Sequence, residues 1–301
     1  ELAPVTTARG VESFMPTSWR TRADGASDGV AGARDGTGRA HPRPAGERRR
    51  AGRVGAPMAA SPFTARIGVD GARAGWVVAR ATPGLPELHL VPRFVDLVDA
   101  ALDAGILVDI PIGLPDADSP VRTCDAEARR RLGARRSSVF PAPSRAALRS
   151  ASWEEANAVN RGSTGRGLPR QSWGIVPKIR EVDDLLVERP RLVGRIRESH
   201  PELAFAWLLE GPAAHHKATP EGARTRWRAL DRVWPGISER ARTWTRGRGG
   251  VALDDVADAL ALLALGVTGR SIPLPDPPPR DARGLPVEIV VHATLAPSPS
   301  A

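Results

Sequence analysis

The sequence predicts an α/β fold in which helices cover a mixed β-sheet. Three observations lead to this fold class. The first is a series of strand-like apolar runs joined by short turns, the second is a segment with helical spacing, and the third is a further strand after that helix, which implies a crossover connection. The chain has 301 residues, which is enough for one large domain or two small ones with a sizeable core.

The first part of the expected domain contains four strands and one helix. The strands are expected at residues 65–70, 75–81, 87–91 and 106–110. Short turns join the first three strands, which therefore form an antiparallel meander. Apolar residues then follow helical spacing from residue 94 to residue 102, and Gly105 ends that helix. Pro111 ends the fourth strand.

The second part begins with a long insertion at residues 111–190. It has little apolar regularity outside three expected helical stretches, near 125–132, 152–160 and 177–188. The elements expected after it are a short strand at 193–198, helices at 202–209, 220–234 and 253–267, and a late strand at 287–291. The proline-rich stretch 273–279 interrupts the chain between the last two of these.

We expect a single folded domain over residues 65–292, with disordered segments on either side. Residues 1–60 are rich in Arg, Gly, Ala and Pro, and they show neither the helical nor the strand period. Such a segment cannot bury enough apolar surface to offset its ordering entropy. Residues 293–301 are also expected to be disordered. Met58 precedes the first strand and is a candidate natural start.

The composition excludes several classes of protein but does not name a partner. The formal charge is +9, yet Lys178 and Lys217 are the only lysines among 43 basic residues. This preference for arginine over lysine, together with abundant Ala, Gly and Pro, is typical of the codon usage of a GC-rich bacterial genome. The positive charge alone therefore does not establish nucleic-acid binding. The single cysteine, Cys124, excludes a disulfide scaffold. The apolar runs are too short to span a membrane, and we expect a cytoplasmic location.

Two aspartates lie within or at the end of expected apolar strands, where burial of a charged side chain is unfavourable. Asp70 ends the first expected strand, and Asp109 lies inside the apolar run 106–110, where an unpaired carboxylate costs several kcal/mol. If these two strands are neighbours in the sheet, the two side chains project side by side. The sequence therefore predicts an acidic site at one edge of the sheet.

The helix expected at 253–267 is the third place where acids meet apolar residues. It is apolar on both sides past its first turn, which predicts a helix that is buried on both sides. Asp255 and Asp258 stand near its start on one face. Acids in a first turn can simply complement the helix dipole, but Asp258 lies a turn further in. A helix packed across the sheet would bring both to Asp70 and Asp109.

Converging carboxylates without a His/Cys set favour Mg²⁺ or Mn²⁺ over zinc. Two such ions roughly 4 Å apart can activate a water and stabilise the leaving oxygen of a phosphodiester. They would also relieve the repulsion that otherwise raises the pKa values of neighbouring carboxyl groups.

Six segments, in this order, resemble the domain of unknown function 429 family: IGVDGARAGW, VDIPIGLP, SSVFPAPSR, PKIREVD, ESHPELAF and DDVADALALLALG. Members of that family are predicted to be RNase H-like nucleases. The resemblance covers residues 66 to 291 and implies an RNase H-like fold, in which a five-stranded mixed sheet with an antiparallel first half has helices on both faces. The segment DVADALAL also resembles the last helix of RuvC-type Holliday junction resolvases, which implies catalytic and metal-binding roles for Asp70, Asp109, Asp255 and Asp258.

RNase H enzymes also place a glutamate on their first helix, and residues 93–104 offer only aspartates. Glu198 or Glu202 is the candidate for the missing metal ligand, and Glu198 is preferred because it ends a strand. Glu202 is equally compatible with a first-turn acid.

Basic and hydroxyl side chains of the insertion are candidates for binding a substrate phosphate backbone. The substrate-binding candidates are Arg122, Arg136, Ser137, Ser138, Arg145, Lys178 and His200. Alternatives stay open: the arginines also fit a solvated face, Lys178 also fits a pair with Glu181, and His200 also fits a buried, hydrogen-bonded histidine. His215 and His216 are expected at the surface.

We therefore expect a two-metal nuclease that hydrolyses the phosphodiester bonds of DNA or RNA, with Mg²⁺ or Mn²⁺ as cofactor. One alternative is an ATP-dependent phosphotransferase of the actin or sugar-kinase type, which would need glycine-rich phosphate loops in two duplicated halves. The other alternative is a nucleic-acid-binding module without catalysis.

Overall fold

The computed structural model of the protein describes residues 63–101 and 104–295. The expected segment 1–60 lies outside the described residues, as do residues 296–301. Residues 293–295, which we expected to be disordered, form a short 3₁₀ helix (Ala293–Leu295). None of the described helices is long and apolar enough to cross a membrane.

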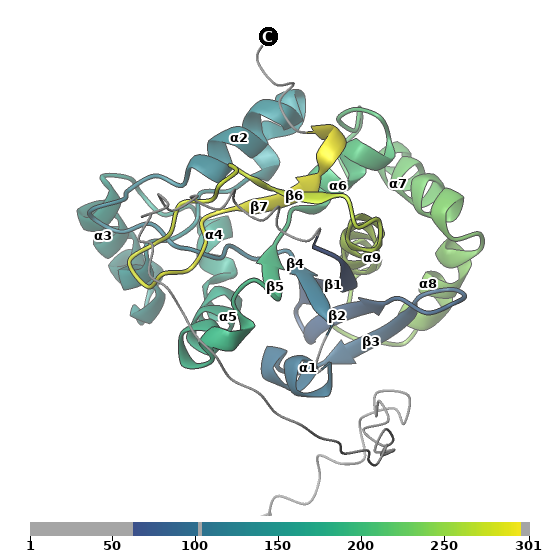
Figure 1. The fold of residues 1–301 in the computed structure, drawn as a ribbon, viewed down its shortest axis with the longest axis horizontal. Helices are drawn as coiled ribbons and strands as arrows, with labels where there is room; N and C mark the ends of the chain where they lie inside the picture. The colour runs from purple at the N-terminus through teal and green to yellow at the C-terminus, as the bar shows by residue number, and fades with distance from the viewer. Residues whose placement is uncertain (1–62, 102–103, 296–301) are drawn as a thin grey trace, which may run out of the picture. The chain divides into compact units, whose positions relative to one another are not determined.

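The central element is a five-stranded mixed sheet with the strand order β3-β2-β1-β4-β5 (Figure 1). Its strands are β1 (Ala65–Ala72), β2 (Gly75–Arg80), β3 (Glu87–Val91), β4 (Gly105–Val108) and β5 (Ile196–Glu198). β1, β2 and β3 pair in antiparallel fashion, whereas β4 pairs in parallel with both β1 and β5. The predicted fold class and the predicted antiparallel meander are confirmed, and the strand order is consistent with the RNase H-like fold.

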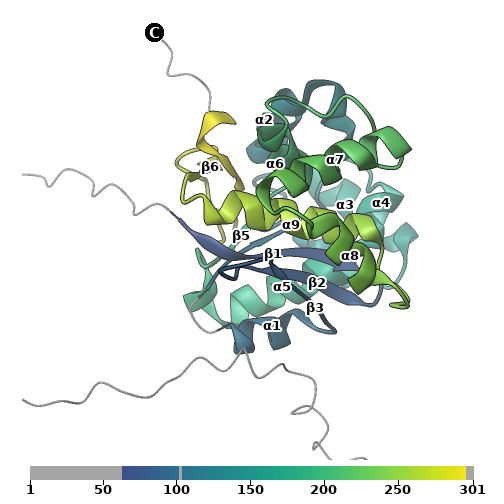
Figure 2. The same cartoon turned by 90° about the vertical axis from the view of Figure 1, so that its right-hand side faces the viewer.

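Helices cover both faces of this sheet (Figure 2). The face with the larger core carries α6 (Pro201–Leu208), α7 (Pro220–Val233), α8 (Ile237–Thr245) and α9 (Leu253–Val267). The opposite face carries α1 (Phe94–Ala100) and α5 (Val176–Glu188). Every residue of α9 from Val256 to Gly266 is buried, as the apolar pattern on both of its sides predicted.

The insertion between β4 and β5 is helical and contributes its own small cores. Besides α5 it contains α2 (Thr123–Leu132), α3 (Trp153–Thr164), α4 (Arg170–Gly174) and the 3₁₀ helices Gly133–Ser138, Arg145–Arg149 and Pro190–Leu192. α2 packs with α6 against a second sheet, whereas α3 and α4 enclose a smaller cluster around Leu168.

Of that second sheet only β7 (Ile289–His292) was predicted, as the late strand at 287–291; β6 (Ser271–Leu274) and the pairing of the two strands were not. β6 pairs antiparallel with β7, and the turn-rich stretch between them includes the prolines that we expected only to interrupt the chain. Pro273 tolerates strand pairing because β7 is the only strand that pairs with β6 among the described residues, and on its other side β6 has only an isolated bridge between Ser271 and Phe63. α8 was also missed, because it is polar over most of its surface and buries only Ile237 and Ala241.

A carboxylate-lined candidate active site

The sheet places Asp70 and Asp109 next to each other. Val69 of β1 is paired with Val108 of β4 in parallel register, and the Asp109 amide donates to the Val69 carbonyl oxygen at 3.0 Å. Asp70 and Asp109 are the residues that follow this pair, so their side chains point to the same side of the sheet. β1 does not end at Asp70 as expected, because it runs on to Ala72 in its hairpin with β2, and β4 ends one residue before Asp109.

A glycine allows α9 to cross β1 at this point. A Cβ on Gly68 would overlap the backbone carbonyl oxygen of Ala259 and the backbone nitrogen of Leu263. Only a glycine therefore permits so close an approach of strand and helix. Asp70 lies two residues beyond Gly68 and points to the same face. The crossing thus brings Asp258, one residue before Ala259, to the side of the sheet that carries Asp70 and Asp109.

Burial and neighbouring charges both affect the ionisation of these carboxylates. The Asp70 residue is only 9% exposed, and burial raises the pKa of its carboxyl group well above the usual range, reinforced by the charges of Asp109, Asp258 and Asp255. Burial likewise raises the pKa of Asp109. Asp258 is 4% exposed, and burial raises its pKa to about 6 although a neighbouring lysine opposes this shift. Burial, and for Asp70 also the neighbouring carboxylates, therefore disfavours the ionised forms of these three groups.

That neighbouring lysine is Lys217, which sequence reasoning missed. Its Nζ donates to Asp258 Oδ2 at 2.7 Å and lies 3.4 Å from Asp254 Oδ2. Burial lowers the pKa of Lys217, but the charge of Asp258 and the hydrogen bond to it have the larger combined effect and raise it. Lys217 lies in the loop that we expected to be plain surface. The rarity of lysine in an arginine-rich chain was the one feature that could have identified it.

Asp255 has a different position from the other three aspartates. Its Oδ2 accepts a hydrogen bond from the Ala252 amide at 2.8 Å, so this carboxylate caps the first turn of α9. It does not line the cavity described next, although its charge contributes to the raised pKa of Asp70. The assignment of Asp255 as a metal ligand stays a prediction.

Asp70, Asp109 and Asp258 open into a cavity of about 600 Å³ between the sheet edge, the insertion and the start of α6. Of the predicted site residues, the cavity is lined by Asp70, Asp109, Arg122, Ser137, Ser138, Lys178, Glu198, His200 and Asp258. Residues that were not predicted there include Arg73, Arg135, Phe140, His216 and Lys217. Segments that lie far apart in the sequence thus meet at one place. His216, which we expected at the surface, is exposed and lies at this wall.

Lys178 approaches the cavity from α5, on the opposite side of β1. Its Nζ donates to the Gly75 carbonyl oxygen at 2.6 Å and lies 4.3 Å from the centre of the Trp76 ring. Burial lowers the pKa of Lys178. The expected alternative, a pair with Glu181, is not formed, because Glu181 accepts hydrogen bonds from Trp76 Nε1 and the Phe94 amide instead.

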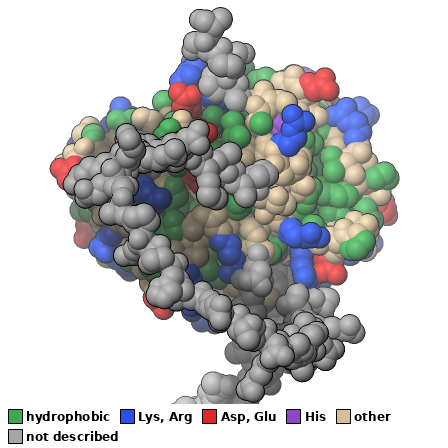
Figure 3. Space-filling view, viewed as in Figure 1, with side chains coloured by type: hydrophobic (Ala, Val, Ile, Leu, Met, Phe, Trp, Pro, Cys, Tyr) green, Lys and Arg blue, Asp and Glu red, His purple; other side chains and the backbone are tan. Residues whose placement is uncertain are grey.

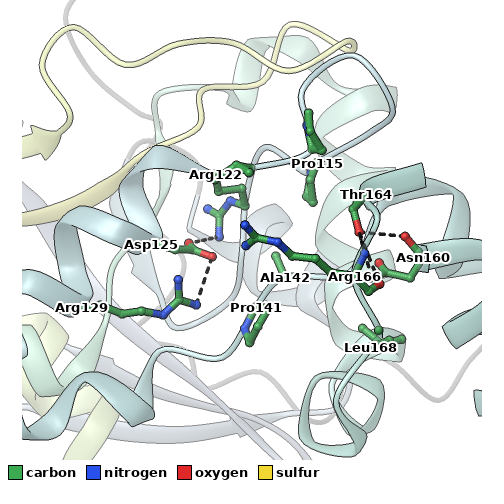
Figure 4. A pocket seen from close by; sticks show the side chains of 13 residues that line it. Pro115, Arg122, Asp125, Arg129, Pro141, Ala142, Asn160, Thr164, Arg166 and Leu168 are labelled. Carbon is green, nitrogen blue, oxygen red and sulfur yellow. Dashed lines mark hydrogen bonds and ion pairs between the residues drawn. The ribbon is translucent and has the colours of Figure 1, made fainter. Parts of the chain in front are cut away.

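Glu198 and Arg122 form a buried network with Asp125 rather than pointing freely into the cavity. Arg122 donates to Glu198 Oε2, to Asp125 Oδ1 at 2.9 Å and to the Ile112 carbonyl oxygen at 3.1 Å. Glu198 Oε2 also accepts from the Ile112 amide at 2.7 Å. In Figure 4, Arg122 and Arg129 point toward Asp125 from two sides. This bonding supports a structural role, and the alternative ligand Glu202 is likewise held by Arg226.

The remaining candidates divide into those at the cavity and those away from it. His200 Nδ1 accepts from the Glu202 amide at 3.1 Å, and its Nε2 lies 3.3 Å from the Ser138 carbonyl oxygen, which corresponds to a neutral ring with the proton on Nε2. Ser138 Oγ donates to the Arg135 carbonyl oxygen at 2.8 Å. Arg136 is exposed and does not line the cavity. Arg145 forms ion pairs with Asp183 and Asp281, also outside the cavity.

The donor set determines which ion this site suits. Within the described residues, no group of three or more His, Cys, Asp or Glu side chains is arranged to hold a metal ion. Mg²⁺, however, is commonly held by one or two carboxylates together with waters and substrate phosphates. The adjacent pair Asp70 and Asp109, with raised pKa values that a cation would relieve, fits that mode of binding.

Comparison with known families gives one match. Residues 68–280 match the model of a family described as "Protein of unknown function (DUF429)". No curated protein and no solved structure matches the chain.

Proposed function

The chain belongs to the DUF429 family, and we propose that it is a divalent-metal-dependent hydrolase that cleaves phosphodiester bonds of nucleic acid. The observation that carries this proposal is the pair Asp70 and Asp109, which stand side by side on β1 and β4 with Asp258 opposite them in one cavity. Their raised pKa values favour a cation between them.

Asp70 and Asp109 would hold the ion, and Mg²⁺ or Mn²⁺ suits their oxygen donors. When bound, such an ion activates a water and stabilises charge on the phosphate oxygens. Because residue 68 is a glycine, α9 can pack closely on β1, and this packing positions Asp258 near Asp70 and Asp109 without the help of an ion. Asp70 and Asp258 are themselves buried, and electrostatic interactions with a bound phosphate are stronger beside buried groups than in bulk water.

Basic and hydroxyl groups on the insertion side of the cavity support a phosphate-containing substrate. Arg135, Ser137 and Lys178 line the same cavity as the aspartates, and the Nε of Arg135 is buried without a hydrogen-bond partner. A phosphate oxygen is a suitable acceptor for that group. His200 is neutral as hydrogen-bonded here, and it holds the Ser138 segment to the start of α6.

Recognition through this cavity agrees with the distribution of basic side chains. On the uncovered part of the face in Figure 3, Lys and Arg side chains lie in separate groups rather than in one continuous basic patch. A long duplex held along such a surface is less well supported than a strand whose phosphate enters the cavity. The cytoplasmic location stays part of this proposal.

The test is cleavage of labelled single-stranded and structured DNA and RNA by the purified chain with Mg²⁺, Mn²⁺ or EDTA. We expect metal-dependent cleavage that Asp70→Asn and Asp109→Asn each reduce by at least about 100-fold, on the scale of losing a group that stabilises the transition state. Asp96→Asn is the matched control, because Asp96 pairs with Arg93 on α1 and lies outside the cavity.

Three results would refute the proposal: no cleavage of any substrate, cleavage that persists in EDTA, or cleavage that both site variants retain. Binding of nucleic acid without cleavage would favour the non-catalytic alternative. The phosphotransferase alternative needs a second, duplicated half, and the described residues contain one five-stranded sheet.

A further inference from the structure

Both lysines of this chain line the same cavity. Lys178 and Lys217 are the only lysines among 43 basic residues, and both contribute to the wall that carries Asp70. All remaining Lys or Arg positions of the chain are arginines. The cavity therefore contains the two positions at which a lysine stands, and lysine differs from arginine in shape. A lysine ammonium is a compact point charge with three donors, whereas a guanidinium is a broad planar fork.

The surroundings of the two lysines differ. Lys178 Nζ donates to a backbone carbonyl oxygen, that of Gly75, and among the described residues no carboxylate forms an ion pair with it. Lys217 Nζ lies between two carboxylates of α9, at 2.7 Å from Asp258 Oδ2 and 3.4 Å from Asp254 Oδ2. Its side chain is 38% exposed, so it reaches the acidic site from the cavity wall and keeps one side toward the open space.

Lys217 therefore stands where a second cation of a two-metal site would stand. Asp70 and Asp109 form one pair of adjacent donors, and Asp258 is a third carboxylate of the site and is buried. One oxygen of Asp258, Oδ2, is already hydrogen-bonded to Lys217. The charge of Lys217 also reaches the other members of the site, because it lowers the pKa values of Asp70 and Asp109 against the effect of burial.

We propose that the ammonium of Lys217 takes the place of the second metal ion, so that this site binds one divalent ion at Asp70 and Asp109. The inference rests on the proposed function and changes its mechanism from two ions to one ion and a fixed positive charge. Lys217 would stabilise negative charge on a phosphate in the cavity by electrostatic attraction, without transferring a proton.

The test counts bound ions and does not depend on catalysis. Isothermal titration of the full chain with Mn²⁺, checked by electron paramagnetic resonance of the free ion, gives the number of ions per chain. We expect one ion for the unmodified protein and two for Lys217→Ala, because the substitution frees Asp258 and leaves room for a hydrated ion. Lys217→Arg keeps the charge and should bind one ion.

Lys178→Gln is the matched control: it removes the other lysine charge of the same cavity without freeing a carboxylate, and it should still bind one ion. Lys217→Gln retains a hydrogen bond to Asp258 and provides a second neutral variant if Lys217→Ala unfolds. Thermal melting shows which variants are folded.

Any result other than a change from one ion to two overturns the inference. Two ions in the unmodified protein would leave the proposed hydrolase standing with a two-metal mechanism. One ion in both the unmodified protein and the neutral variants would show that Lys217 does not occupy a cation position. No ion in any of them would remove the metal site of the proposed function as well.

Discussion

Replacing Asp70 by asparagine should stabilise the metal-free protein at neutral pH. Asp70 Oδ1 accepts a hydrogen bond from the Gly71 amide at 2.7 Å, and an asparagine carbonyl oxygen can accept the same bond. The substitution therefore removes a buried charge while keeping shape and hydrogen bonding. The lost charge is repelled by Asp109, Asp258 and Asp255, so its removal relieves electrostatic repulsion within the folded state.

The magnitude follows from the geometry of the parallel strands. Adjacent strands lie about 5 Å apart, and two unit charges at that separation repel by about 3 kcal/mol at an effective dielectric constant near 20. The charge of Lys217 attracts Asp70 and offsets part of this repulsion. We expect a net gain in unfolding free energy of about 2 kcal/mol, or a melting temperature raised by roughly 4–8 °C for a domain of this size.

The gain should grow with pH. Below the ordinary aspartate pKa of 3.8, the carboxyl group is protonated in both folded and unfolded states and carries no penalty. As the pH rises from that value through the raised pKa of the folded state, the unfolded state ionises more readily and the unmodified protein loses stability. The asparagine side chain of the variant does not titrate, so the difference between the two proteins reaches its full size above the raised pKa.

Thermal melting from pH 4 to pH 8 in EDTA measures this difference, and repetition in Mg²⁺ adds a second readout. Mg²⁺ should raise the melting temperature of the unmodified protein but not that of Asp70→Asn. Asp183→Asn is the contrast: Asp183 is as buried as Asp70 but is paired with Arg145, which would keep only Asp281 as a partner, so the substitution should destabilise. An Asp70→Asn protein that melts lower than the unmodified chain at pH 8, or a pH-independent difference, would refute the reasoning.

Two further substitutions test the packing that positions the site. Gly68→Ala should destabilise the fold by several kcal/mol, because its Cβ would meet the backbone of Ala259 and Leu263 rather than flexible side chains; chemical denaturation measures this, and an unchanged midpoint would contradict it. Arg122→Met should cost about 3–5 kcal/mol, because it leaves Glu198 buried without its cation and leaves Asp125 with only the more distant Arg129. A loss below about 1 kcal/mol in denaturant unfolding would show that Arg122 is not essential to that network.

The sequence was sufficient to predict the main sheet because each of its strands is apolar and bounded by turn residues. The order of β1, β2 and β3 follows from short connections, and the crossover to β4 follows from one helix. β6 could not be predicted, because its sequence includes a proline and its partner β7 lies more than a dozen residues further along the chain. Long-range pairing of short, proline-containing strands leaves no periodic pattern.

The position of the acidic site was predictable in part, because local sequence patterns identify some of its residues. Asp70, Asp109 and Asp258 could be identified because an acid within an apolar run is costly unless something offsets it. The network of Glu198, by contrast, depends on Arg122 from the insertion, and no local pattern connects residues 76 positions apart. Lys217 was missed because its loop has no regular structure that would place it over α9.

The energetic balance of α9 explains how the fold tolerates so much unfavourable charge. From Val256 to Gly266 this helix is buried on all sides, so its packing on β1 contributes far more than the repulsion at its first turns removes. The close crossing at Gly68 fixes Asp258 near the sheet, and Lys217 then offsets one of the negative charges there. Because Lys217 lies in a loop, its side chain can move away from the acidic site more easily than a side chain that is packed in the core. The site can therefore be folded without a metal ion and still keep Asp70 and Asp109 available to bind one.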